Sequence, residues 1–183
     1  TLPTIHSPAN NAVARFLDAP PKVDFRWGTV ASAQSYRVEI STDPEFDHLL
    51  VDDRLDSAAF RHSNLASGEY YWRVSAGVGE LFGPASQPRR LQVTRDSEPP
   101  QLELQSIEQL IAGNYVLRGK TTRDATVYVL GASVDPSPDG YFEHVFKPRS
   151  GTQSIVVESI DAVGNVTYKS QVLHVPGDSG RSD

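Results

Sequence analysis

The most regular alternation of hydrophobic and polar residues in the chain lies between Gly68 and Ala76. One face takes every second residue and is aromatic or aliphatic: Tyr70, Trp72, Val74 and Ala76. The opposite face takes the residues between them: Tyr71, Arg73 and Ser75. Successive side chains of a strand point to opposite faces, so this pattern predicts a half-buried β-strand. A lone strand is not stable in water, and the surrounding sequence must therefore supply partners.

Shorter segments with the same signature surround this strand. Alternation or short apolar runs predict further strands at 23–27, 36–40, 49–51, 55–60 and 91–93, after a proline-punctuated, broken first strand within 1–17. Glycines at 77, 79 and 83 indicate a loop after the Gly68–Ala76 strand. About seven short strands in roughly 95 residues is the spacing expected of a β-sandwich.

Four positions in this half resemble those of a fibronectin type III domain. The resemblance places a tryptophan on the second strand, an aromatic residue on the third, and a leucine and a tyrosine around the sixth: Trp27, Tyr36, Leu65 and Tyr70. It implies that Tyr70 forms the tyrosine corner of that family. The sequence YRVEISTDPEF, followed by GEYYWRV, is most similar to bacterial modules of LysM–FecR type envelope proteins and other secreted multidomain proteins. The Arg-Gly-Asp motif that binds integrins is not present.

The second half carries a different set of strand patterns. Inward-facing sets are predicted around Leu102, Leu117, Val127, Ile155 and Leu173, and Asp139-Gly140 predicts a hairpin turn. The order GKTTRDATVYV, then DGYF, then a segment from Ile155 to Asn165 resembles bacterial Ig-like modules. Asp161 is expected to cap a turn with Gly164 at positive φ, although this loop could also supply oxygens to a metal ion.

These patterns together predict an all-β chain of two tandem immunoglobulin-like or fibronectin type III-like β-sandwiches. The first sandwich is predicted at 1–95 and the second at 101–175. The polar stretch at 96–100 ends in two prolines and is predicted to be a short, stiff linker that restricts the domains to a roughly end-to-end relation. The glycine-rich segment 176–183 is predicted to be a disordered tail.

Composition narrows the classes of function. The formal net charge of −6 is unfavourable for sequence-independent nucleic-acid binding, which needs a basic face. The chain has no cysteine, which excludes disulfides, thiolate metal sites and cysteine nucleophiles. No hydrophobic run is long enough to span a membrane. Methionine is also absent, and a processed or excised piece is therefore expected.

The best candidate surface follows from strand parity. If the strands of Tyr36 and Tyr70 are neighbours, then Arg37, Tyr71 and Arg73 project together from the outer face of one sheet. A basic patch with an aromatic ring on an acidic protein could bind an anionic partner or stack on a sugar. The simpler interpretation, which we favour, is cross-strand pairing with Glu39, worth about 0.2–1 kcal/mol per pair.

Other features point to ordinary structure rather than to chemistry. An acidic cluster could hold calcium, but it lacks the order of an EF-hand loop, and a solvated loop is the simpler explanation: Asp43, Glu45, Asp47, Asp52, Asp53 and Asp56. The five histidines are scattered and show no metal-ligand spacing. The Gly177–Gly180 motif resembles a serine-protease nucleophile loop, but no partner histidine or aspartate can be placed. No cofactor, metal site or catalytic residue is predicted.

The sequence therefore favours a non-enzymatic spacer or protein-interaction segment. By resemblance, it would belong to a bacterial cell-envelope or secreted protein, located in the periplasm or outside the cell, with an envelope protein as partner. The alternative is a glycan- or peptidoglycan-binding accessory module, which an exposed aromatic row with nearby polar groups would support. An enzyme would require a deep pocket with two carboxylates or a histidine metal site.

Overall fold

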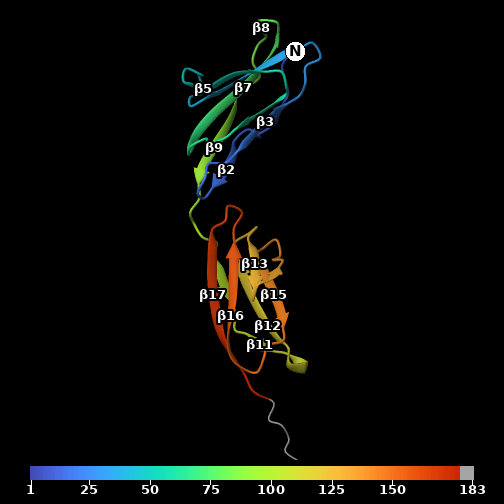
Figure 1. Cartoon of the computed structure of the whole chain (residues 1–183), viewed down its shortest axis with the longest axis vertical. Coiled ribbons are helices and arrows are strands. Elements are labelled where there is room, and N and C mark those ends of the chain that lie inside the picture. The colour runs from blue at the N-terminus through green and yellow to red at the C-terminus, as the bar shows by residue number, and fades with distance from the viewer. Residues whose placement is uncertain (178–183) are drawn as a thin grey trace, which may run out of the picture. The chain divides into compact units, whose positions relative to one another are not determined.

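The computed structural model describes residues 1–177 as two compact units, Thr1–Asp96 and Ser97–Asp183, of which residues 178–183 lie outside the described part. Both units consist almost entirely of β-strands (Figure 1). Each unit is a β-sandwich with its own hydrophobic core. The all-β fold predicted from the sequence is thereby confirmed, whereas the independence of the two domains stays a prediction.

Unit 1 contains a three-stranded and a six-stranded sheet. The smaller sheet has the order β1-β3-β6, with bounds Ile5–Ser7, Val23–Trp27 and Ala59–His62. The larger sheet has the order β2-β9-β7-β4-β5, with bounds Ala12–Phe16, Arg89–Arg95, Gly68–Val78, Ser35–Ser41 and Leu49–Leu55. A short strand β8 (Leu81–Phe82) turns back along the end of β7, so the predicted loop at the glycines is partly a hairpin.

The broken first strand contributes to both sheets. β1 pairs with β3 in the small sheet, and β2 runs parallel to β9 in the large one. Between them, the Arg89 guanidinium donates to the backbone carbonyls of Ile5 and Pro8, each at 2.8 Å. Carbonyls that leave a β-ladder need such partners when water cannot reach them. Arg89 therefore supports the point at which the chain changes sheets.

The core of unit 1 is filled by the residues that alternation assigned to it. Trp72 is fully buried, and its ring meets the edge of Phe25 at a centroid distance of 4.9 Å. The Tyr70 hydroxyl donates to the Ala66 carbonyl at 2.9 Å. That bond joins the start of β7 to the turn before it, as the expected tyrosine corner requires.

Unit 2 is a sandwich of two four-stranded sheets. One sheet joins β10, β12, β11 and β15, with bounds Leu102–Leu104, Tyr115–Thr121, Glu108–Gln109 and Tyr141–Phe146. A single 3-10 turn, η1 (Ile111–Gly113), lies between β11 and β12. The other sheet has the order β14-β13-β16-β17, with bounds Ala132–Val134, Thr126–Val129, Gly151–Ile160 and Val166–Val175. β16 and β17 pair along their whole length and lie side by side (Figure 1).

One turn in unit 2 differs from its prediction. Gly140 has φ of +85° within a turn from Ser137 to Tyr141, so the turn itself is present. The flanking strands do not form a hairpin, because β14 pairs with β13 whereas β15 pairs with β12. The Asp-Gly pair determines a local reversal of the chain, but the burial of apolar faces determines which strands pair. The hairpin prediction was therefore wrong at this point.

The turn between β16 and β17 is as predicted. One Asp161 carboxylate oxygen accepts from the backbone N–H groups of Val163, Gly164 and Asn165 at 2.9–3.0 Å. Gly164 has φ of +100°. Burial raises the pKa of Asp161, but the hydrogen bonds from Asn165, Val163 and Gly164 together lower it by more. The net pKa is therefore below its usual value. Asp161 thus serves the fold of the turn.

Candidate interaction surface

The predicted site residues lie on the outer face of the six-stranded sheet of unit 1. β4 and β7 are neighbours, and Glu39 is directly opposite Arg73, with Tyr71 opposite Ser41. We call this the paired-charge face and define it by eight residues: Arg37, Glu39, Asp52, Arg54, Glu69, Tyr71, Arg73 and Arg90. The structure thus places Arg37, Tyr71 and Arg73 on one face of adjacent strands, as strand parity requires.

Both predicted arginines have acidic partners on that face. Arg37 binds the Asp52 carboxylate through Nε at 2.6 Å and Nη2 at 2.7 Å. Arg73 binds Glu39 through Nε at 2.8 Å and Nη2 at 3.2 Å. Paired hydrogen bonds of this geometry are stronger than single ones. The bond from Arg37 also holds the pKa of Asp52 below its usual value.

Glu39 is the centre of this arrangement. Its side chain is only 6% exposed, and Nη2 of Arg37, two residues earlier on β4, lies 3.6 Å from the Glu39 carboxylate. The Arg73 guanidinium also lies over the ring of Phe46, 4.0 Å from its centroid. A buried carboxylate is costly unless charges and hydrogen bonds compensate it. Arg73 provides both, and it covers Phe46 as well.

Tyr71 belongs to a second chain of contacts. Its hydroxyl donates to Glu69, which also accepts from Arg90. The hydrogen bond from Arg90 lowers the pKa of Glu69, and the bond to Glu69 raises the pKa of Tyr71. The polar groups of the predicted site are thus engaged within the protein. Their role in binding a partner stays a prediction.

Sequence reasoning named Glu39 as a pairing partner but missed Asp52, Phe46 and Glu69. Asp52 and Glu69 have the parity of an outer face, which was a usable signal once their strands were aligned. Phe46 gave no such signal. It lies in the loop after β4 with φ of +64°, a conformation that alternation cannot anticipate for a bulky residue.

The acidic residue that opens this loop is used by the backbone. The backbone N–H groups of Asp47 and His48 donate to the Asp43 carboxylate at 3.0 and 2.8 Å, and the Ser41 hydroxyl donates at 2.9 Å. These bonds, with that from Asp47 the largest, hold the pKa of Asp43 well below its usual range. Across residues 1–177, no three His, Asp or Glu side chains are grouped so that they could hold a metal ion.

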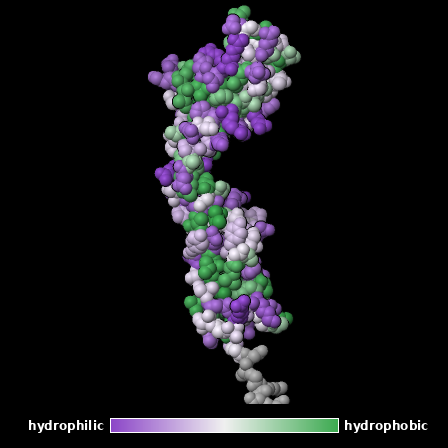
Figure 2. Space-filling model, viewed as in Figure 1, coloured by the Kyte–Doolittle hydropathy of each residue, from purple (hydrophilic) through white to green (hydrophobic). Residues whose placement is uncertain are grey.

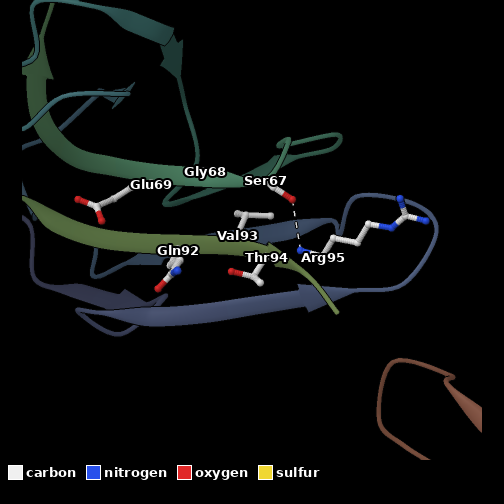
Figure 3. A pocket seen from close by; sticks show the side chains of 7 residues that line it. All are labelled: Ser67, Gly68, Glu69, Gln92, Val93, Thr94 and Arg95. Atoms are coloured by element: carbon white, nitrogen blue, oxygen red, sulfur yellow. Dashed lines mark hydrogen bonds between the residues drawn. The ribbon is translucent and has the colours of Figure 1, made fainter. Parts of the chain in front are cut away.

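A shallow hollow lies at the start of β7, where this strand meets β9 (Figure 3). Gly68 and Glu69 of β7 line it together with Ser67 just before that strand, and Thr94 and Arg95 line it from β9. The Arg95 backbone N–H donates to the Ser67 hydroxyl at 3.2 Å, as the dashed line shows. Its single carboxylate, Glu69, is paired with Arg90. The hollow therefore lacks the two carboxylates that glycoside hydrolysis needs.

A second hollow lies beside β15 in unit 2 and is lined by two carboxylates, Asp135 and Glu143, together with Arg118 and Tyr141. Glu143 accepts from Arg118 Nε at 2.7 Å, and its side chain is 54% exposed. A general acid needs an apolar pocket that keeps the carboxyl group protonated. An exposed carboxylate paired with an arginine is the opposite environment.

The outer face of the β14-β13-β16-β17 sheet has a different chemistry. Val127 and Val157 are fully buried, so the alternate residues of these strands face outward. We call this the tyrosine face and define it by seven of the outward residues on the three longer strands, those in the rows from Tyr168 to Val172: Tyr128, Ser154, Val156, Glu158, Tyr168, Ser170 and Val172. Tyr168 and Val172 are 64% and 75% exposed. The space-filling view shows hydrophobic side chains at the surface of this unit (Figure 2).

Glu158 lies in the middle of one cross-strand row. It is opposite Tyr128 on β13 and opposite Tyr168 on β17. The Tyr168 hydroxyl donates to Glu158 at 3.2 Å, and the negative charge of Glu158 raises the pKa of Tyr168. The sequence alone does not bring Tyr128 and Tyr168 together, because the registers of the three strands cannot be aligned from it.

Comparison with solved structures supports the fold. The chain is similar to the fibronectin(III)-like modules of Clostridium thermocellum CbhA, with a TM-score of 0.57 and 18% identity over 99% of this chain and 97% of that one. It is also similar to the FN1-FN3 domains of chicken CNTN1, with a TM-score of 0.52 and 11% identity over 97% of this chain and 65% of that one. The sequence matches no protein-family model and no curated protein.

These likenesses establish fibronectin type III-like and Ig-like sandwiches as the fold. At such identities they carry no information about ligand or partner. Within the part of the chain that the structure describes, no helix has the length and apolar character needed to cross a membrane.

Proposed function

We propose that this chain is a non-enzymatic spacer and protein-interaction segment of a bacterial cell-envelope or secreted protein. The observation that carries the proposal is that the chain consists of two β-sandwich units, each closed around its own core. Such units transmit force and present surfaces without moving parts. The bacterial context rests on the sequence resemblance to modules of LysM–FecR type envelope proteins.

The connection between the units supports a spacer role. The Asp96 backbone N–H donates to Phe16 in unit 1, and the Pro100 carbonyl accepts from the Thr167 hydroxyl in unit 2 at 2.6 Å. The chain passes from one unit to the other between these two bonds, within the short stretch 96–100 that the sequence predicts as the linker and that includes Pro99.

Pulling on single molecules tests the spacer role. Two separate unfolding events are expected, and each should release about 300 Å of chain, because an extended residue spans up to about 3.5 Å. Only the event from unit 1 should be altered by a Trp72→Ala change. A single event that releases the whole chain at once would contradict the proposal of two independent spacer units.

The interaction role needs a separate test in the envelope. Cross-linking in intact cells, with a photoreactive residue at position 37 or 71, should capture a discrete envelope protein if the paired-charge face contacts a partner. The same residue at position 26, which is exposed on the small sheet, provides the control. Equal capture at positions 26 and 37 would argue against a partner at the predicted site.

A further inference from the structure

We propose that the tyrosine face of unit 2 binds a neutral polysaccharide chain, with Tyr128 and Tyr168 stacking on sugar rings and Glu158 accepting sugar hydroxyls. This site is distinct from the predicted patch on unit 1, and it does not depend on the spacer role. The proposal rests on the charge, the hydrogen-bonding groups, the spacing of the tyrosines and the size of this face.

Charge is the first argument. Among the described residues, no lysine or arginine has the outward parity of β13, β16 and β17, and Glu158 is the one carboxylate of the tyrosine face. Lys169 is exposed on the edge strand β17 but has the opposite parity, since it pairs with the buried Val157. An anionic ligand on this face would therefore meet the charge of Glu158 with no cation on the same face, on a protein of net charge −6. A neutral, hydroxyl-rich ligand meets no such penalty and can donate to Glu158.

The available polar groups match the same ligand. Tyr128, Ser154 and Ser170 have no hydrogen-bond partner for their hydroxyls among residues 1–177, and Glu158 receives one bond, from Tyr168. Hydroxyls both donate and accept, as sugar hydroxyls do. The aromatic rings beside them have electron-rich faces that attract the C–H bonds on the apolar side of a sugar ring.

Spacing favours a chain over a single sugar. Tyr128 and Tyr168 are separated by one intervening strand, β16, so their backbones lie about 10 Å apart. A ligand that contacts both rings must therefore extend across the strands. Val156 lies in the next row of the face and is 43% exposed, so apolar surface adjoins the aromatic row.

Size argues against a protein as the occupant. The Glu158 row spans three strands, whereas the rows of Val156 and Ser154 span only β16 and β17, because β13 ends at Val129. Together the three rows cover roughly 15 Å by 15 Å, or about 200 Å². A stable protein interface buries about 800 Å² on each partner. The face is too small for a stable protein complex, whereas a few sugar units would cover it.

Co-sedimentation with two insoluble probes, swollen cellulose and chitin, tests the proposal on the whole chain. Retention on at least one probe is expected, and the two probes distinguish plain hydroxyl sugars from N-acetylated sugars. Tyr168→Ala should weaken retention about tenfold, as loss of one stacking ring implies. Tyr168→Phe keeps the ring and should bind nearly as well. An anionic polymer, polygalacturonate, should show no binding in a native gel.

Tyr141→Ala is the matched control, because Tyr141 is also well exposed in unit 2 but lies on the opposite sheet. Its retention should equal that of the unchanged chain. The proposal is overturned if neither probe retains the chain, or if Tyr141→Ala loses as much binding as Tyr168→Ala. It is also overturned if sedimentation equilibrium shows a dimer that Tyr168→Ala abolishes, since a second copy would then occupy the face.

Discussion

The paired-charge face of unit 1 and the tyrosine face of unit 2 are both outer faces of twisted antiparallel strands, yet their side chains differ in charge and in pairing. On the first, Arg37, Arg73 and Arg90 each have a carboxylate partner. On the second, exposed tyrosine and valine side chains surround one carboxylate. Charges that are already paired gain little from a new partner, whereas unpaired aromatic surface can still be desolvated.

The difference teaches where to look for binding on a sandwich fold. Before the structure, the arginines of unit 1 were the more attractive candidates because charge is visible in a sequence. Their partners come from other strands: Asp52 lies on β5, and Glu69 with Arg90 joins β7 to β9. On the tyrosine face, Tyr128 and Tyr168 have one carboxylate between them, and Tyr168 is largely exposed whereas Tyr128 is partly covered. The face with less charge is therefore the better candidate for a ligand.

The largest expected effect comes from the core directly beneath the paired-charge face. Trp72→Ala should lower the free energy of unfolding of unit 1 by about 3–5 kcal/mol, because it removes a fully buried indole. Both tryptophans, Trp27 and Trp72, are in unit 1, so the remaining Trp27 fluorescence reports this transition. Leu117→Ala, in the core of unit 2, should leave it unchanged. If Leu117→Ala shifts the Trp27 transition, the two units do not unfold independently.

The paired-charge face itself should show the next largest effect. Arg73→Ala leaves Glu39 buried with only the more distant Arg37 and also uncovers Phe46, and it should cost about 2–3 kcal/mol. Arg54→Ala removes more exposed contacts, with Glu80, which is 92% exposed, with the Gly79 carbonyl and with the Phe82 ring, and should cost about 1 kcal/mol. Denaturant unfolding followed by tryptophan fluorescence measures both. Equal losses for the two variants would mean that the burial of Glu39 carries no energetic weight.

Acid should also lower the stability of the two units to different extents. In unit 1, the pKa values of Asp24, Asp43, Asp52 and Glu69 are lowered by Arg61, by backbone N–H groups, by Arg37 and by Arg90. Among the described residues of unit 2, Asp161 is the carboxyl group with a clearly lowered pKa. A carboxyl group with a lowered folded-state pKa contributes its stability above its ordinary pKa of about 4 and loses it as the pH falls.

Unit 1 should therefore lose more stability than unit 2 between about pH 5 and pH 3. Calorimetry, with the unit 1 transition assigned by tryptophan fluorescence, measures the two midpoints on one sample. Added salt at neutral pH should weaken the pairs of Asp24, Asp52 and Glu69 but not the backbone hydrogen bonds of Asp43 and Asp161. Parallel loss in both units on acidification would show that the carboxyl groups with lowered pKa values in unit 1 do not set the acid sensitivity.

The sequence predicted which residues of single strands face inward or outward far better than it predicted which residues of different strands lie side by side. Period-two alternation identified Trp72 as inward and Tyr71 and Arg73 as outward, because burial in a strand follows parity. The Asp161 turn was predictable because its hydrogen bonds are local. Strand registers were not, since residues as distant as Tyr128, Glu158 and Tyr168 meet only once three strands are aligned. The Asp139-Gly140 turn shows the same limit, because the local reversal was correct and the strand partner was wrong.

The smallest expected effect is the one that separates binding from folding. Tyr168→Ala should change the stability of unit 2 by less than about 0.5 kcal/mol, because the ring is 64% exposed and its hydroxyl makes one bond, to Glu158. Chemical denaturation followed by far-ultraviolet circular dichroism measures this on the whole chain. A loss above about 1 kcal/mol would mean that the tyrosine supports the sheet. A near-silent change in stability together with weakened retention on polysaccharide assigns the ring to the ligand, because an exposed aromatic side chain that does not stabilise the fold gains its energy only when something covers it.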